Sequence, residues 1–167
     1  MNAPRPVVKA HSRRNQIAVI GLAACDPVNR ELAVRVGREI ARGGATLLSG
    51  GMGGVMEAAS LGAREAGGLV IGILPLGERH TGNAYLDVEI VTNLGHARNV
   101  VLAHSADALI AVCGGYGTLS EIAVALKLGK PVVGLNSWTI DGMLQAENPE
   151  QAVQLAMARI HPTGRQP

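Results

Sequence analysis

The chain has 167 residues, with 47% hydrophobic and 17% charged residues, 22 glycines and a formal net charge of +2. This length suits one domain with a buried core, and no apolar run approaches the length of a membrane span. Two cysteines exclude a disulfide framework, and aromatic residues, at 2% of the chain, are too few for the stacking surface of a single-strand nucleic-acid groove.

Residues 1–15 form a basic segment that holds four of the 15 Lys and Arg residues and no acidic residue. The other 11 basic side chains stand against 13 acidic ones, so the rest of the chain is nearly neutral. The segment lacks the apolar stretch of a secretion signal, and its composition is typical of a disordered tail. We therefore expect a cytoplasmic protein in which residues 16–162 form a single domain.

Short apolar runs alternate with helical patterns along this domain. The runs show little alternation of polar and apolar residues, as expected for strands buried on both faces of a parallel sheet. They lie at 17–21, 45–50, 69–75, 108–115 and 131–135, and the helical patterns at 28–42, 54–66, 95–104, 118–128 and 148–160. This order predicts a doubly wound, mostly parallel α/β sheet of the Rossmann-like type, with strand order 3-2-1-4-5 and helices on both faces. We interpret residues 76–93 as an irregular insertion with a short strand at 88–91.

Two glycine-rich turns fall at the carboxyl ends of predicted strands, where ligands of such folds bind. "SGGMGG" spans 49–54 and "CGGYG" spans 113–117, and each runs into a helix. Glycine lets the backbone approach a ligand, and a helix start offers unpaired N–H groups and a positive dipole end. Neither turn is a dinucleotide or Walker motif, and sharp turns without a ligand are the alternative. The predicted phosphate-binding residues are Gly50, Gly51, Met52, Gly53, Gly54, Gly114, Gly115, Tyr116, Gly117 and Thr118.

Two stretches of the chain resemble the LOG-like, or "lysine decarboxylase-like", Rossmannoid superfamily. They are "LLSGGMGGVMEAASLGAREAGGLVIGILP" and "ARNVVLAHSADALIAVCGGYGTLSEIAVALKLGKPVV", and the resemblance covers about residues 16–136. Phosphoribohydrolases of this group carry an Arg-Lys pair on a helix and then P-G-G-x-G-T-x-x-E, and they release a nucleobase from a nucleoside 5′-monophosphate. The matching residues here are Arg98 of the first motif and Gly114, Gly115, Gly117, Thr118 and Glu121 of the second.

The chain departs from that pattern at three positions. Asn99 replaces the Lys, Cys113 replaces the Pro, and Ser120 stands where the hydrolases have Glu. In these respects it is similar to a sister branch that includes molybdenum-cofactor carrier proteins. The resemblance implies a phosphorylated nucleotide-like or pterin ligand, with a molybdopterin-type cofactor and an AMP-like nucleotide as candidates. A carrier or storage protein is our first interpretation, a nucleoside 5′-monophosphate phosphoribohydrolase the second, and a nucleic-acid or signalling-nucleotide sensor the third.

Arg98 and Glu121 have roles in both leading interpretations. In a hydrolase, the Glu121 carboxylate would stabilise the oxocarbenium-like ribose and Arg98 would hold the phosphate. In a carrier, Arg98, Asn99 and the glycine turns would hold the ligand, and Glu121 would accept its protons. Two structural alternatives stay open: a capping box between Thr118 and Glu121, and a surface salt bridge for Arg98.

Cys25 and Cys113 follow strands that are neighbours in the predicted order, so both thiols are expected near the pocket unless they are simply small packing residues. The five His residues show no metal-ligand spacing, and neither a metal nor a cofactor for folding is predicted. Apolar residues in the helices at 95–104 and 118–128 suit a helical interface, which together with the resemblance predicts a homodimer or homotetramer. We expect no membrane partner, and the nearly neutral domain argues against a nucleic-acid partner.

Overall fold

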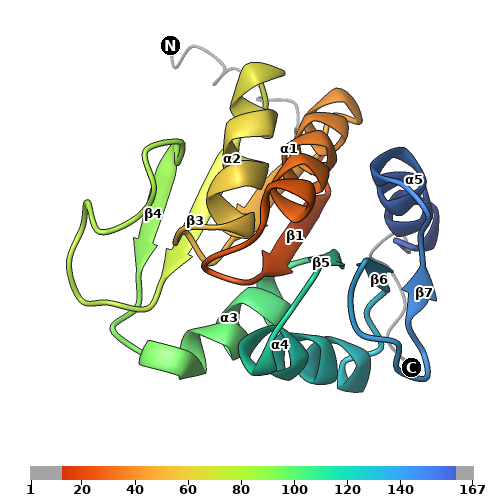
Figure 1. Ribbon diagram of the computed structural model, residues 1–167. Helices are drawn as coiled ribbons and strands as arrows, with labels where there is room; N and C mark the ends of the chain where they lie inside the picture. Colours follow the sequence, from red (N-terminus) through yellow and green to blue (C-terminus); the bar gives the residue numbers. More distant parts are fainter. Residues whose placement is uncertain (1–12, 161–167) are drawn as a thin grey trace, which may run out of the picture.

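The computed structural model describes residues 13–160, in which helices cover both faces of a seven-stranded sheet (Figure 1). The strands are β1 (Gln16–Gly21), β2 (Thr46–Ser49), β3 (Val70–Leu74), β4 (Val88–Val91), β5 (Ala108–Val112), β6 (Val132–Leu135) and β7 (Leu144–Gln145). The helices are α1 (Pro27–Arg42), α2 (Val55–Glu65), the 3-10 turn η1 (Gly95–Ala97) that leads into α3 (Arg98–Ser105), α4 (Tyr116–Lys127) and α5 (Pro149–Arg159). Most of the predicted basic segment, residues 1–12, lies outside the described residues, so the predicted domain bounds stay a prediction.

The strands pair in the order β4-β3-β2-β1-β5-β6-β7, and every pair is parallel. The predicted order 3-2-1-4-5 corresponds to β3-β2-β1-β5-β6 and is confirmed. The short strand expected at 88–91 is β4, which adds to one edge of the sheet. The two-residue strand β7 at the other edge was not expected.

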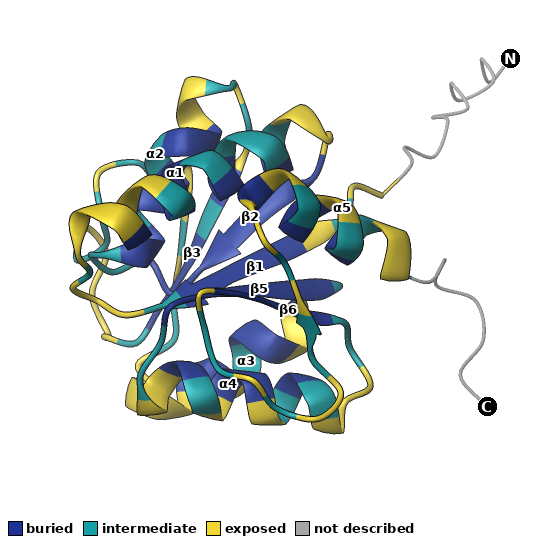
Figure 2. Ribbon diagram, turned by 45° about the vertical axis from the view of Figure 1, so that its right-hand side comes forward, coloured by how far each residue is buried: buried dark blue, intermediate teal, exposed yellow. Residues whose placement is uncertain are grey.

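The helices divide between the two faces of the sheet, with α1, α2 and α5 on one side and α3 and α4 on the other (Figure 2). Strand β1 contributes to both cores because successive side chains of a strand point to opposite faces. Ile17 and Val19 pack under the first group of helices, and Ala18 and Ile20 under the second. Burial on both sides explains why these strands read as unbroken apolar runs.

Helices α1 and α2 pack at very short range because each has a glycine at the crossing. A Cβ atom on Gly37 would lie 1.9 Å from the carbonyl oxygen of Ala59, and one on Gly62 would lie 1.9 Å from that of Val34. Any larger residue would force the helices apart. The contact fixes α2, and therefore the glycine-rich turn that leads into it.

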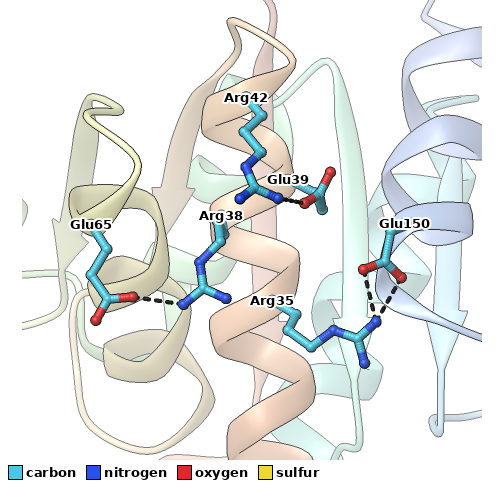
Figure 3. A network of polar contacts seen from close by, with 6 residues as sticks. All are labelled: Arg35, Arg38, Glu39, Arg42, Glu65 and Glu150. Carbon is cyan, nitrogen blue, oxygen red and sulfur yellow. Dashed lines mark hydrogen bonds and ion pairs between the residues drawn. The ribbon is translucent and has the colours of Figure 1, made fainter.

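On the outer surface, arginines of α1 reach carboxylates on both neighbouring helices (Figure 3). Arg35 pairs with Glu150 of α5, and Arg38 pairs with Glu65 of α2, each at 2.7 Å. Their side chains are a third to a half exposed, so such pairs each contribute only about 0–1 kcal/mol to stability. Within residues 13–160, no helix combines the length and apolar character that crossing a membrane requires.

Candidate functional site

Three loops meet at the carboxyl edge of the sheet, after β1, β2 and β5. The segment after β1 lies between the two glycine-rich turns and contacts both. The N–H of Val55, at the end of the first turn, donates to the carbonyl of Leu22 at 3.0 Å. On the other side, a Cβ atom on Gly115 would be 3.0 Å from the Leu22 side chain. The glycine-rich turns therefore flank one short segment at the same sheet edge.

The first turn, residues 50–54, bends through left-handed backbone at Gly51 and Gly54, with φ of 72° and 63°. A Cβ atom on Gly54 would collide with the backbone of the segment after β1, so the turn also needs glycine for space. The N–H of Gly51 donates to the Ser49 hydroxyl at 3.1 Å. Within residues 13–160, the N–H groups of Met52, Gly53 and Gly54 donate no hydrogen bond, which leaves three donors for a ligand.

The second turn leads into α4 through left-handed backbone at Cys113, with φ of 48°, followed by Gly114. The helix starts at Tyr116 with Gly115 as its N-cap, and no side chain of residues 13–160 caps it. The first N–H groups of a helix have no partner inside it, so this end also presents donors together with the positive end of the helix dipole. Tyr116 itself is 86% exposed and its ring lies outside the core.

The capping box proposed for Thr118 and Glu121 is wrong. The helix begins two residues before Thr118, which places Thr118 inside the first turn instead of at the cap. The N–H of Leu119 already donates to the Gly115 carbonyl in regular helical fashion. Thr118 and Glu121 are both buried, so the structure leaves Glu121 without the simple structural role that the sequence offered.

Arg98 opens α3 and is buried, with 8% of its surface exposed. Its guanidinium lies beside the first turn, since a Cβ atom on Gly50 would be 1.8 Å from Nη1. Among residues 13–160, the buried Nε and Nη1 groups of Arg98 have no hydrogen-bond partner. The alternative of a surface salt bridge for Arg98 is therefore wrong. Leaving such donors unsatisfied costs about 1–3 kcal/mol each, which an anionic ligand would remove.

Glu121 is buried close to Arg98, with 6% of its surface exposed. Burial raises the pKa of its carboxyl group to about 7, although the Arg98 charge acts in the opposite direction. Burial likewise lowers the pKa of Arg98, and Glu121 opposes that change. Arginine stays protonated in proteins, so the pair consists of a fixed cation and a carboxyl that titrates near neutral pH.

Asn99 and Ser120, two of the three departures from the phosphoribohydrolase pattern, contact each other. The Asn99 side-chain amide donates to the Ser120 hydroxyl at 3.0 Å, and that hydroxyl donates to the Gly117 carbonyl at 2.6 Å. Asn99 therefore joins α3 to the start of α4.

The third departure, Cys113, is buried, whereas Cys25 is partly exposed. Burial raises the pKa of both thiols, and the proximity of Cys113 adds to the effect at Cys25, which disfavours the thiolate form of each.

Three asparagines at this edge were not predicted as site residues. Asn136 follows β6 and donates to Asn29 at 2.8 Å, and Asn29 in turn contacts the N-cap of α1, Asp26. Asn83 reaches the first glycine turn from the insertion between β3 and β4. The contacts of Asn136 with Asn29 and of Asn83 with Met52 join residues distant in sequence, which no local pattern predicts.

Two hollows of the surface are lined by other residues than Arg98 and Glu121. One of about 370 Å³ opens beside Lys130 and Asp141. Another of about 360 Å³ is lined by Arg79, Asn83 and Glu89, and it borders the first glycine turn through Asn83. Within the part of the chain that the structure describes, no group of three or more His, Cys, Asp or Glu side chains is placed to hold a metal ion. The glycine turns with Arg98 and Glu121 are therefore the strongest candidate site.

Comparison with known proteins places this chain in a family. A model described as the SLOG cluster4 family matches residues 14–161. An uncharacterised protein of Archaeoglobus fulgidus is 51% identical over 144 residues, which cover 86% of this chain and 95% of that protein. The cytokinin riboside 5′-monophosphate phosphoribohydrolase of Mycobacterium tuberculosis is 36% identical over 117 residues, and the match spans 63% of its length. A probable enzyme of the same name from Oryza sativa is matched over 52% of its length.

Two solved structures cover nearly the whole domain. The molybdenum cofactor binding protein of Rippkaea orientalis is 38% identical with a TM-score of 0.85, covering 90% of this chain and 100% of that one. The molybdenum cofactor carrier protein of Chlamydomonas reinhardtii is 35% identical with a TM-score of 0.80, covering 87% and 98%. The DNA processing protein A of Streptococcus pneumoniae, at 18% identity, shares the fold. The chain thus belongs to the SLOG cluster4 family, in the LOG-like Rossmannoid superfamily and near its molybdenum-cofactor carrier branch.

Proposed function

We propose that this protein binds a phosphorylated small molecule at the carboxyl edge of its sheet, and that it carries or stores a molybdopterin-type cofactor. The observation that carries the proposal is the buried guanidinium of Arg98 beside the first glycine turn, with two nitrogen groups that have no partner in the part of the chain that the structure describes. A phosphate group supplies the acceptor oxygens that these donors lack.

The surrounding residues suit the same group. The free N–H groups of Met52, Gly53 and Gly54 face no partner within the described residues, and the start of α4 adds further donors. The anion site combines donors from three elements. These are the first glycine turn, the second turn with the start of α4 and its helix dipole, and Arg98 of α3. The phosphate of a molybdopterin-type cofactor or of an AMP-like nucleotide would be held by these groups.

The hydrolase interpretation rests on Glu121. A carboxyl group with a pKa of about 7 is suited to proton transfer, and Arg98 lies close to it. The relatives of Oryza sativa and Mycobacterium tuberculosis that are named phosphoribohydrolases match this chain at 37% and 36% identity. The chain spans only 52% and 63% of their lengths. The Asn99–Ser120 hydrogen bond occupies positions where the resemblance places Lys and Glu in the hydrolases, which favours carriage over cleavage.

The predicted homo-oligomer belongs to this proposal as well. Val100 of α3 is 44% exposed, and Leu128, just after α4, is 39% exposed. These apolar side chains lie on the helix pair whose apolar residues predict an interface. We propose that α3 and α4 pair with those of a second copy, and size-exclusion chromatography with light scattering tests this directly. A cytoplasmic location stays a prediction.

One experiment separates the two ligand-based functions. The purified protein is titrated with AMP and, separately, with molybdopterin-type cofactor by calorimetry, and free adenine is measured after incubation with AMP. Binding of the cofactor without adenine release supports a carrier, whereas adenine release that Glu121→Gln abolishes supports the hydrolase. Arg98→Gln is expected to weaken binding by at least about tenfold, and Arg159→Gln, at an exposed position, serves as the control for lost charge. If neither ligand binds, the shared premise is wrong.

A further inference from the structure

The insertion between β3 and β4 forms a long loop at one edge of the sheet (Figure 1). It donates two hydrogen bonds to carbonyl groups of the first glycine turn. The backbone N–H of Asn83 donates to the carbonyl of Gly51 at 2.8 Å. The side-chain amide of the same residue donates to the carbonyl of Met52 at 3.0 Å. One residue thus binds two successive carbonyls of the turn, from 31 positions away in the sequence.

Because the peptide unit is planar, the two Asn83 contacts also set the direction of the N–H groups in the turn. In a trans peptide, the C=O of one residue and the N–H of the next point in opposite directions across a rigid plane. With the Gly51 carbonyl directed at Asn83, the N–H of Met52 points away from Asn83. With the Met52 carbonyl directed at the Asn83 amide, the N–H of Gly53 also points away. Both N–H groups are among those that donate no hydrogen bond within residues 13–160.

Asn83 is itself held in place from two sides. Its side-chain oxygen accepts from the N–H of Tyr85 at 3.1 Å, a local turn that fixes the rotamer. Three residues further on, Leu86 packs where three glycines leave room. A Cβ atom on either Gly72 or Gly82 would come within 2.5 Å of a Leu86 methyl group, and one on Gly51 within 3.3 Å. The insertion therefore packs on β3 and on the first glycine turn through Leu86.

We propose that Asn83 is a positioning residue of the ligand site, which holds the N–H groups of Met52 and Gly53 in the orientation that binds a phosphate group. This inference rests on the proposed function, because it gives the insertion a part in recognising the ligand's phosphate. Asn83 acts through the turn and does not itself contact the ligand. The insertion thereby makes phosphate recognition depend on an element outside the two glycine motifs.

Asn83→Ser provides the sharpest test. A serine hydroxyl is able to accept from the Tyr85 N–H but is too short to reach the Met52 carbonyl. The variant therefore loses the side-chain contact to the Met52 carbonyl and keeps the backbone N–H contact to the Gly51 carbonyl. We expect affinity for AMP and for inorganic phosphate to fall roughly two- to tenfold, the usual value of one hydrogen bond. Thr81→Ala is the matched control, because the Thr81 hydroxyl donates to the Glu78 carbonyl inside the insertion and leaves the turn untouched.

A second measurement separates orientation from folding. The ¹⁵N order parameters of residues 51–54 are expected to fall in Asn83→Ser from about 0.85, the value of a rigid backbone, while those of residues 114–118 stay unchanged. A protein that binds AMP and phosphate equally well with and without Asn83→Ser would overturn this inference alone. An equal loss in Thr81→Ala would also overturn it, by assigning the effect to the insertion as a whole. Failure of the unmodified protein to bind either probe would instead overturn the proposed function, on which the inference depends.

Discussion

The buried carboxyl of Glu121 leads to a prediction about stability that needs no ligand. Its pKa in the folded protein is about 7, against an ordinary value of 4.5, because burial disfavours the charged form. An acid with a raised folded pKa stabilises the fold while it is protonated in both states, below about pH 4.5. That contribution is lost progressively as the pH rises from 4.5 through 7, because the unfolded chain ionises first.

The perturbation is Glu121→Gln, which keeps the size of the side chain and removes the charge. A difference of one pKa unit is worth about 1.36 kcal/mol, so ionised Glu121 destabilises the fold by about 3 kcal/mol above pH 7. The variant is expected to be more stable than the parent by about that amount at about pH 8, which raises Tm by roughly 6–12 °C. At about pH 5 the two proteins are expected to differ by only about 1 kcal/mol or less.

Urea unfolding at several pH values between these limits measures the effect. The difference in the free energy of unfolding between variant and parent should grow with pH and level off above pH 7. Glu31→Gln, at an exposed position of α1, is the control and should show little change with pH. A difference that is the same at every pH, or a variant that is less stable than the parent at about pH 8, would refute the assignment of Glu121 as a buried, charge-disfavoured carboxyl.

Three further predictions follow from the packing of named residues. Gly50→Ala places a methyl group against the flexible end of Arg98, so it should leave Tm within a few degrees of the parent and weaken AMP binding by about tenfold or more in calorimetry. Gly37→Ala meets the rigid backbone at Ala59 and should lower the free energy of unfolding by about 1–3 kcal/mol, whereas Arg35→Gln, which removes an exposed ion pair, should lower it by less than about 1 kcal/mol. In a double-mutant cycle by urea unfolding, Asn99→Ala and Ser120→Ala should show a coupling of about 1 kcal/mol, and simple additivity would contradict the hydrogen bond between them.

The sequence was informative where local rules decide the structure. The apolar runs predicted the five central strands and their order, because strands buried on both faces leave a signal in every residue. The start of α4 was misjudged because the S/T-x-x-E pattern at Thr118 competes with a glycine turn that begins the helix earlier. Strand β7 was missed because its two residues are too few to carry any periodicity.

The candidate site was predictable only in part. Arg98 and the glycine turns were identified by motif, but the burial of Arg98 depends on how the start of α3 lies against the turn after β2, which no local pattern encodes. The contact of Asn83 with the first turn joins segments 31 positions apart, and Asn99 reaches Ser120 across 21 positions. Such contacts follow from the tertiary arrangement of elements and not from the composition of either segment.

The electrostatic state of the site bears on what binds there. Arg98 is buried with two donors that find no partner within residues 13–160, and Glu121 is buried with a pKa of about 7, so both groups reduce stability in the absence of a ligand. A phosphate group that accepts from Arg98 removes the first cost, and its negative charge favours protonation of the nearby Glu121. Phosphate binding would then be accompanied by proton uptake at neutral pH, and affinity would weaken as the pH rises above 7. A hydrolase that uses Glu121 as the acid for departure of the base would need that proton, in place of the carboxylate role expected from the sequence, whereas a carrier needs only the affinity. The two functions then differ in whether Glu121→Gln reduces turnover or merely removes the pH dependence of binding.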